Sequence, residues 1–495
     1  MALRSPNRRQ SRYCGAEANS DSREVDVSMK SDSPLLDRNL VQDTLSEAMS
    51  NGGEWAEIFV EDRQSASADF DEARVEAMAS SRDLGAGIRV TVGDITGFAH
   101  TSDLTTNGLF EAAQAAAAVA KGGSQVKPIV LDGNGLAESS ARILPESVSK
   151  TRKVELLEQT NDAARAENAA ISQVNVRYSE GRRRILVANT DGLFNADDQT
   201  RTLLSVNCVA TGDQGLQTGR ETVGYTVGFE LFEEHDVEAM ARRAAARAVT
   251  KLAARPAPSG QLPVVIERGG GGVLFHEACG HGLEADLVNK GASVFRDRVG
   301  ELVAAPSVTL VDDGTMGIEW GTVAIDDEGC PTQRNVLIED GILTDYMWDH
   351  LRSRSAGRPA SGNGRRQSYQ HLPMVRMTNT FVTNGEAEPQ DIITDTKNGV
   401  YVAQLGGGQV NTATGDFVFG MTEAYLIENG EITVPLREGN LIGNGPEVLQ
   451  NIEVIGNDFA MGSPGTCGKD GQGVPVGDGQ PTLRVAALTI GGTAS

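Results

Sequence analysis

The spacing of apolar residues in the N-terminal half alternates between the three- to four-residue period of helices and the two-residue period of strands. Helical spacing that ends at a Gly- or Asn-containing stretch predicts a helix, and alternating runs between Gly-containing turns predict antiparallel strands. The predicted helices are Leu35–Leu45, Asn107–Lys121, Ser147–Asn168 and Glu234–Ala254. The predicted strand runs are Trp55–Val60, Val75–Ala79, Ile88–Val92, Thr96–Ala99, Ile171–Ser179, Arg183–Asn189, Leu203–Ala210 and Thr222–Glu230. Helices flank a group of strands twice, which predicts two successive α/β modules.

The pattern changes after a linker-like segment, Arg255–Gly260. Strand-like runs separated by Gly, Asn and Asp turns follow, and only one convincing helix is predicted, beginning near Gly272. The runs are Leu262–Glu267, Val308–Val311, Val336–Ile338, Val400–Gln404, Ala424–Glu428, Ile452–Ile455 and Thr482–Ile490. Of the 57 glycines, 38 fall in residues 256–495. Because glycines serve strand turns and close backbone approaches, this half is predicted to be β-rich.

These patterns predict an α+β protein with several domains. A mixed α/β N-terminal region of two modules is followed by a β-rich C-terminal catalytic domain with one metal-binding helix. The predicted divisions are a disordered N-terminal tail (1–33), a first α/β module (34–123), a central α/β module (124–255) and the C-terminal domain (256–495). A length of 495 residues agrees with more than one domain.

The charge balance narrows the classes of partner. Lys and Arg number 44 against 68 Asp and Glu, so the formal net charge is -24. Nucleic-acid binders and proteins that dock on anionic membranes use basic surfaces instead. No stretch approaches the roughly 20 apolar residues of a membrane span. Direct binding to nucleic acid or to a membrane is therefore not expected.

Cysteine usage predicts a reducing, cytoplasmic environment. The five cysteines are dispersed and odd in number, which is not typical of a disulfide framework. They are Cys14, Cys208, Cys279, Cys330 and Cys467. The Arg-rich first sixteen residues lack an apolar segment, so a disordered tail is favoured over a transit peptide, and a secretory signal is not expected.

The predicted C-terminal helix contains the segment that points to chemistry. His276 and Glu277 are adjacent, and His281 follows five residues after the first histidine. The zinc helix with histidines at i and i+4 places them roughly 40° apart, whereas i and i+5 gives roughly 140°. Both imidazoles can face one ion only if the helix is distorted. A π-bulge would achieve this, and Gly280 makes a local break easier.

If an ion is bound there, Glu277 stands beside the first ligand and can act as general base on a metal-bound water. A catalytic zinc requires a third protein ligand and an open position. From chemistry alone several residues could supply that ligand. They are Glu284, Asp286, Cys279, His371 and Cys467.

Several motifs in this order resemble the TldD/PmbA family of metallopeptidases, on the TldD side. The main one is GGVLFHEACGHGLEAD at Gly271–Asp286. The others are Gly362–Tyr369, Arg376–Thr380, Gly465–Gln472 and Val474–Val485. The resemblance extends from about Leu35 to Ile490 and leaves the N-terminal tail outside.

The resemblance implies a zinc peptidase with ligands His276, His281 and Cys467 and with Glu277 as catalytic base. Because the PmbA (TldE) branch lacks the HExxxH motif, this chain is expected to be the catalytic type. The implied substrates are peptides or unfolded protein segments. The implied assembly is a homodimer, or a heterodimer with a PmbA/TldE-like subunit.

Other interpretations remain beside this one. The alternative function is a non-catalytic peptide-binding or regulatory protein of the gyrase-modulator type, with a structural metal. Phosphate binding at the glycine turn Gly269–Gly272 is a weaker hypothesis. For Arg365 and Arg366, ordinary ion pairing is favoured over binding a peptide carboxylate. Gly406–Gly408 suggests either an open strand edge for a peptide or a β-bulge.

Overall fold

The computed structural model describes residues 33–123, 128–136, 138–213, 215–437 and 439–492. The predicted disordered tail, residues 1–33, lies outside this part of the chain except for Ser33. From Pro34 onward the contacts form one compact unit. The predicted division of that unit at residues 124 and 256 stays a prediction.

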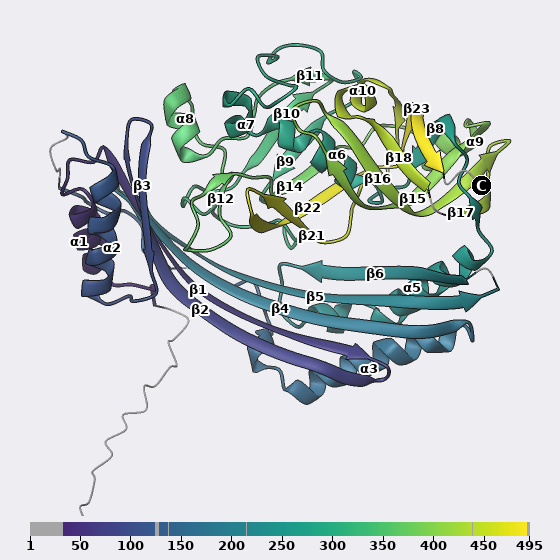
Figure 1. Ribbon diagram of the computed structural model, residues 1–495, viewed down its shortest axis with the longest axis horizontal. Coiled ribbons are helices and arrows are strands. Elements are labelled where there is room, and N and C mark those ends of the chain that lie inside the picture. The colour runs from purple at the N-terminus through teal and green to yellow at the C-terminus, as the bar shows by residue number, and fades with distance from the viewer. Residues whose placement is uncertain (1–32, 124–127, 137, 214, 438, 493–495) are drawn as a thin grey trace, which may run out of the picture. The chain divides into compact units, whose positions relative to one another are not determined.

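Six of the described strands form one antiparallel sheet in the order β3-β2-β1-β4-β5-β6 (Figure 1). Their bounds are β1 Trp55–Asp71, β2 Arg74–Val92, β3 Ile95–Thr101, β4 Ile171–Asn189, β5 Phe194–Gly212 and β6 Gly215–Tyr225. The strands of both predicted α/β modules therefore join in a single sheet. Several strands are much longer than predicted: β4, for example, continues through 180–182, between two predicted runs.

Helices pack on this sheet near its two ends. The first group is α1 (Arg38–Ala48) with α2 (Thr106–Val119), and the second is α3 (Lys150–Glu167) with α5 (Val237–Leu252). Short turns precede the second pair, η1 (Pro145–Ser147) and α4 (Leu231–Glu234). Each pair buries an apolar face against the strands and forms a separate core. Side chains of Asp37 and Ser149 accept hydrogen bonds from the first turns of α1 and α3, which sets where these helices begin.

Consecutive residues at the start of strand β1 are all buried. Because alternate side chains point to opposite sides of a sheet, both faces of the strand are buried there. Ile58 and Val60 belong to the core under α1 and α2. Phe59 packs instead with Ile325 and Tyr369 of the C-terminal half. This face of the sheet therefore supports the C-terminal half directly.

The C-terminal half contains two larger sheets and a short two-stranded one. One sheet has the order β15-β8-β23-β18-β16-β17-β7, with β19 on β23; the other has the order β11-β10-β9-β14-β22-β20, with β21 on β22. The strands of the first are β7 Arg255–Pro256, β8 Gly260–Ile266, β15 Asn398–Val410, β16 Asp416–Glu428, β17 Glu431–Arg437, β18 Gly439–Asn444, β19 Ile452–Ile455 and β23 Leu483–Gly492. Those of the second are β9 Leu310–Asp313, β10 Arg334–Glu339, β11 Ile342–Leu343, β14 Asn379–Val382, β20 Ala460–Met461, β21 Gly465–Lys469 and β22 Gln472–Gln480. The short pair is β12 Gly364–Arg365 with β13 Met374–Val375. The prediction of a mixed helix and strand protein with a β-rich C-terminal half is confirmed.

The prediction of one convincing helix in that half was wrong. Helix α6 (Gly272–Ala278) is joined by the 3-10 turn η2 (Gly280–Leu283) and by four more short helices. These are α7 Ala285–Asn289, α8 His350–Ala356, α9 Pro389–Thr394 and α10 Gly445–Gln450. Helices of one or two turns show too little periodicity to be recognised from a sequence. Among the described helices, none has both the length and the apolar character that a membrane span requires.

Charged side chains fill the contact between the six-stranded sheet and the C-terminal half. Arg89 donates to Glu57 at 2.9 Å and to Glu328 at 2.7 Å, and all three side chains are fully buried. Arg366 pairs with Glu57 as well, and Arg183 pairs with Asp327 at 2.8 Å. Buried carboxylates without partners would be costly, so these pairs fix the position of the loops at 326–328 and 364–367 on the sheet.

Replacement of Arg89 is expected to destabilise the protein strongly. Arg89→Ala leaves two buried carboxylates short of a partner, which costs about 3–5 kcal/mol in the free energy of unfolding. Arg484→Ala is the control, because its pair with Glu453 is partly exposed and contributes about 0–1 kcal/mol. Urea unfolding followed by circular dichroism measures both. Equal losses in the two variants would contradict a structural role for the buried pairs.

Candidate metal centre

The two histidines of the HExxxH segment are brought together by a break in the helix. Helix α6 ends at Ala278, Cys279 has φ -123° and ψ -52°, and the chain continues as η2. The π-bulge suggested by the spacing is therefore absent from this described segment, and a helix end takes its place. Gly280 lies at the break because a Cβ there would be 2.2 Å from the sulfur of Met377.

Cys467 reaches the helix from a tight hairpin. Asp470 and Gly471 between β21 and β22 have φ values of 49° and 76°, as the two central residues of a type I′ turn require. This turn sets the register in which Cys467 lies opposite Val474. Buried Arg376 donates to the backbone carbonyls of Cys467 and Gln472 and holds both strands of the hairpin.

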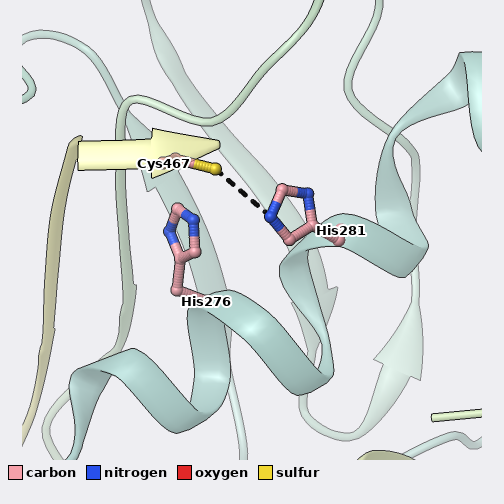
Figure 2. Close-up of side chains that lie close together, drawn as sticks. All are labelled: His276, His281 and Cys467. Atoms are coloured by element: carbon pink, nitrogen blue, oxygen red, sulfur yellow. Dashed lines mark hydrogen bonds between the residues drawn. The ribbon is translucent and has the colours of Figure 1, made fainter. Parts of the chain in front are cut away.

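Three potential ligands converge at this point (Figure 2). The metal-binding atoms of His276, His281 and Cys467 all lie within 4.8 Å of one another. The two imidazole rings are 5.2 Å apart and nearly perpendicular, and Nε2 of His281 is 3.2 Å from the sulfur of Cys467. All three side chains are buried, with exposed fractions of 2%, 5% and 2%.

The polar atoms of this group are better explained by a metal ion than by hydrogen bonding alone. Both ring nitrogens of His276 are buried without a hydrogen-bond partner among the described residues. Burial would raise the pKa of the Cys467 thiol, but the neighbouring imidazoles of His276 and His281 lower it to about 4. A thiolate and two imidazoles are donors that suit zinc. The residues present therefore fit such an ion.

A buried carboxylate and a lysine lie behind His281. Oε2 of Glu284 is 3.0 Å from Nδ1 of His281, and Lys469 donates to the same oxygen at 2.9 Å and to Asp286 at 2.7 Å. Burial would raise the pKa of Glu284, but His281 and Lys469 lower it to about 2. An ionised Glu284 accepts a hydrogen bond from the Nδ1–H of His281, which leaves the Nε2 lone pair directed at the ligand group.

The other third-ligand candidates lie elsewhere or have other partners. Glu284 contacts the nitrogen of His281 that faces away from Cys467, and Asp286 binds Lys469. Cys279 is buried in the C-terminal hydrophobic core. Nδ1 of His371 lies 2.8 Å from the Ser368 hydroxyl, outside the group of three.

Glu277 occupies a different environment from the ligands beside it. Its Oε2 lies 3.7 Å from Nε2 of His281, and its side chain is 28% exposed. A carboxylate that borders a buried ligand group and still reaches solvent is placed to exchange protons with a bound substrate or water.

A cleft of about 470 Å³ begins at the N-terminal end of α6. Gly272, Val273 and Asp478 line it together with the strand segment Gln404–Gly407. Burial raises the pKa of Asp478 to about 6. Asp478 belongs to the quoted motif Val474–Val485, but nothing in the sequence pattern indicated that it lies beside α6.

The lesser motifs have structural explanations in most cases. The N–H groups of Gly269, Gly270 and Gly271 donate to protein acceptors, so these three groups are not free to bind a phosphate. Gly406 and Gly407 fall between the pairs Leu405–Met421 and Gly408–Phe419, where the register shifts, so the segment contains a bulge. Ion pairing was the favoured interpretation for Arg365 and Arg366. Arg366 forms such a pair, with Glu57.

Comparison with known proteins adds three family-level matches. Residues 56–120, 143–252 and 259–492 match the models for PmbA/TldA metallopeptidase domain 1, its central domain and its C-terminal domain. A metalloprotease TldD homolog of Haemophilus influenzae is 41% identical over 83% of this chain and 87% of its own length. A metalloprotease of Methanothermobacter thermautotrophicus is 34% identical over 89% and 96%. A zinc metalloprotease TldD homolog of Saccharolobus solfataricus is 32% identical over 60% and 66%.

Solved structures share the fold. A proposed modulator of DNA gyrase from Thermotoga maritima has a TM-score of 0.76 at 21% identity, covering 92% of this chain and 99% of that one. TldE from Thermococcus kodakarensis has a TM-score of 0.73 at 20% identity, covering 92% and 99%.

Cys467→Ala is expected to remove the metal, whereas Cys279→Ala should not. Both cysteines are buried, but only Cys467 faces the two histidines. Loss of one ligand should lower the affinity for zinc by more than the roughly 10–100-fold of an outer-shell change. Mass spectrometry of the purified proteins measures the metal content, and titration with a chelator measures affinity. Equal metal content in the two variants would exclude Cys467 as a ligand.

In the parent protein the affinity for zinc should fall as the pH falls, because protons compete for the imidazoles and the thiolate.

Glu284→Gln should weaken zinc binding by roughly 10–100-fold without removing a ligand, because the amide no longer fixes the proton on Nδ1 of His281. Asp286→Asn is the matched control, since Asp286 reaches His281 only through Lys469 and Glu284. Competition with a zinc chelator gives both affinities. The interpretation fails if Asp286→Asn lowers the affinity as much as Glu284→Gln does.

Proposed function

This chain belongs to the PmbA/TldD family of metallopeptidases, and we propose that its activity is the zinc-dependent hydrolysis of small or unfolded peptides. The observation that carries this proposal is the position of Glu277. Its partly exposed carboxylate lies beside three buried residues that could hold a metal ion. A metal site with a neighbouring acid–base group is what peptide hydrolysis requires.

His276, His281 and Cys467 would hold the zinc. Two neutral imidazoles and one thiolate form the ligand set of some catalytic zinc sites, and the name of the Saccharolobus relative includes zinc. When bound, zinc supplies a Lewis acid that polarises a carbonyl and lowers the pKa of water. Burial of the three side chains keeps competing solvent away from their donor atoms.

Glu277 would act as the general base and then as the general acid. Its carboxylate takes a proton from the water that attacks the carbonyl carbon of the peptide bond, and it delivers a proton to the departing amine nitrogen. Glu284 and Lys469 keep His281 oriented during this cycle and do not contact the substrate in this proposal.

The cleft at the start of α6 is where we place the substrate chain. Its volume of about 470 Å³ exceeds that of a single side chain, and the strand segment Gln404–Gly407 lies along it. Pockets of this size typically bind a ligand through a few well-placed polar groups. An extended, unfolded segment fits such a cleft, whereas a folded domain would not reach buried ligands.

The alternative is a non-catalytic peptide-binding or regulatory protein with a structural metal. A structural zinc has four protein ligands, whereas a catalytic one keeps a position open. Among the described residues, the candidate ligand group has three members, which favours the catalytic interpretation. The gyrase-modulator description applies to the structural relative from Thermotoga maritima and comes to this chain only as a name.

A partner subunit is part of the proposal. We infer a homodimer, or a heterodimer with a TldE-like chain, because the fold is shared with TldE. Residues 74–83 of β2 are exposed on both faces, and among the described strands they pair with β1 alone, so their other edge is available to a further strand. We also propose a cytoplasmic location, because free thiols such as those of Cys208 and Cys279 persist in a reducing compartment.

Glu277→Gln is expected to retain zinc and to lose hydrolysis. The amide cannot take up the proton, so kcat should fall by about 10²–10⁴-fold while the metal content stays that of the parent. A peptide with a fluorophore and a quencher at its two ends serves as substrate, with and without a TldE-like partner. Glu339→Gln on β10 is the control, because this glutamate is exposed and distant in the fold from α6. Full activity of Glu277→Gln would exclude Glu277 as the base.

A further inference from the structure

A second cavity lies between the six-stranded sheet and the C-terminal half. Its volume is about 190 Å³, and it is separate in its lining from the cleft at α6. Strands β4 and β5 form one side, and Trp320, the segment 365–367 and residues 473–475 of β22 form the other. Exposed Arg63 is among the lining residues, so the cavity reaches solvent.

Two arginines in this cavity are buried without a carboxylate. Arg201 is 8% exposed and Arg365 is 4% exposed. Arg201 donates to the carbonyls of Trp320 and Thr322, both at 2.9 Å, and to the side-chain oxygen of Gln199 at 3.1 Å. Arg365 donates to the carbonyl of Met377 at 2.6 Å. No carboxylate oxygen of the described residues lies within 4.0 Å of either guanidinium.

Three neighbouring arginines of the same cavity are neutralised, whereas exposed Arg63 donates to the carbonyl of Gln367. Arg182 pairs with Asp198 at 2.6 Å, Arg183 pairs with Asp327 at 2.8 Å, and Arg366 pairs with Glu57. Acids are plentiful in this chain, with 68 against 44 basic residues. Scarcity of carboxylates therefore does not explain why Arg201 and Arg365 have none.

The two free cations also repel each other. Burial, followed by the charges of Arg365 and Arg183, lowers the pKa of Arg201 to about 9, with Asp197 and Asp327 opposing the shift. Burial lowers the pKa of Arg365 to about 10, with Asp327 opposing the shift and Arg376 and Arg183 adding to it. Both groups stay cationic at neutral pH, and an anion between them would relieve the repulsion and the cost of burial.

We propose that this cavity binds the α-carboxylate at the C-terminal end of a peptide through Arg201 and Arg365. The planar guanidinium fork matches a carboxylate, and each arginine has N–H donors left over, since it has five. The cavity wall at Val474 lies directly opposite Cys467 in the β21–β22 hairpin. One hairpin thus carries a metal-ligand candidate and part of the carboxylate site. This inference rests on the proposed peptidase function for the identity of the ligand as a peptide.

Comparison of a free-acid peptide with its C-terminal amide tests the proposal. The zinc-loaded protein with Glu277→Gln prevents turnover, and fluorescence anisotropy of an N-terminally labelled pentapeptide measures binding. The free acid should bind about 10–100-fold more tightly than the amide, because a hydrogen bond to a charged group contributes about 1.5–3 kcal/mol. In the same background, Arg201→Gln and Arg365→Gln should each reduce this preference to less than about twofold.

Three controls keep the outcome interpretable. Arg484→Gln removes a partly exposed cation outside the cavity and should leave the preference unchanged. Arg201→Lys and Arg365→Lys keep the charge and should restore part of the preference, which a merely misfolded site would not. Thermal unfolding of every variant reports whether it is folded.

The proposal is overturned if the parent binds acid and amide equally, or if the preference survives in both Gln variants. Tighter binding of inorganic phosphate than of the free-acid peptide would also overturn it, because the cavity would then be a phosphate site. Failure of the proposed function gives a different result. In that case the wild-type protein with zinc cleaves neither peptide, while the preference for the free acid remains.

Discussion

The burial of charged side chains between the six-stranded sheet and the C-terminal half is the constraint on which the arrangement of this protein rests. Each ion taken out of water costs several kcal/mol, so each carboxylate there must lie against a cation. Glu57 meets Arg89 and Arg366, and Glu328 meets Arg89, although Arg89 and Glu328 are 239 residues apart. Few placements of the two halves satisfy all these pairs at once. We therefore interpret the pairs as fixing the position of the C-terminal loops more than as adding net stability.

The same constraint arranges the candidate metal centre. Cys467 is held over the broken helix because buried Arg376 requires backbone carbonyls, and the hairpin supplies two of them. Lys469, two residues further on, requires carboxylates and finds Glu284 and Asp286 directly after η2. The requirement of each polar group for a partner thus brings together segments that are 186 residues apart in sequence at His281 and Cys467. An ion would give the orphaned nitrogens of His276 the partner that they lack.

The sequence alone is enough to predict which residues make up the candidate metal centre, but not how they are arranged in space. Histidines five residues apart required a distortion, and Gly280 marked where it occurs, but a helix end and a bulge leave the same trace in a sequence. The role of Glu284 could not be separated from that of a ligand, because a carboxylate behind a histidine and a carboxylate on an ion have the same spacing. The sequence pattern predicts two runs, Ile171–Ser179 and Arg183–Asn189, whereas β4 is continuous through 180–182. It continues as a strand because Arg182 and Arg183 are neutralised by Asp198 and Asp327, contacts that no local pattern contains.

Arg201 and Arg365, like Arg376, are buried arginines that no carboxylate neutralises, and they differ from Arg376 in lining a cavity. An uncompensated buried charge costs several kcal/mol to take out of water, so stability alone gives no reason for either guanidinium. Their remaining hydrogen bonds go to neutral oxygens, which hold the side chains in place without cancelling their charge. A cation that is fixed but not neutralised is preorganised for an anion, because binding then costs little reorganisation. The β21–β22 hairpin carries Cys467 on one strand and the cavity-lining Val474 on the other. A bound peptide end and a metal ion would therefore both contact this hairpin. An acidic protein that neutralises Arg182, Arg183 and Arg366 around this cavity has left the buried charges of Arg201 and Arg365 unpaired beside its candidate metal centre.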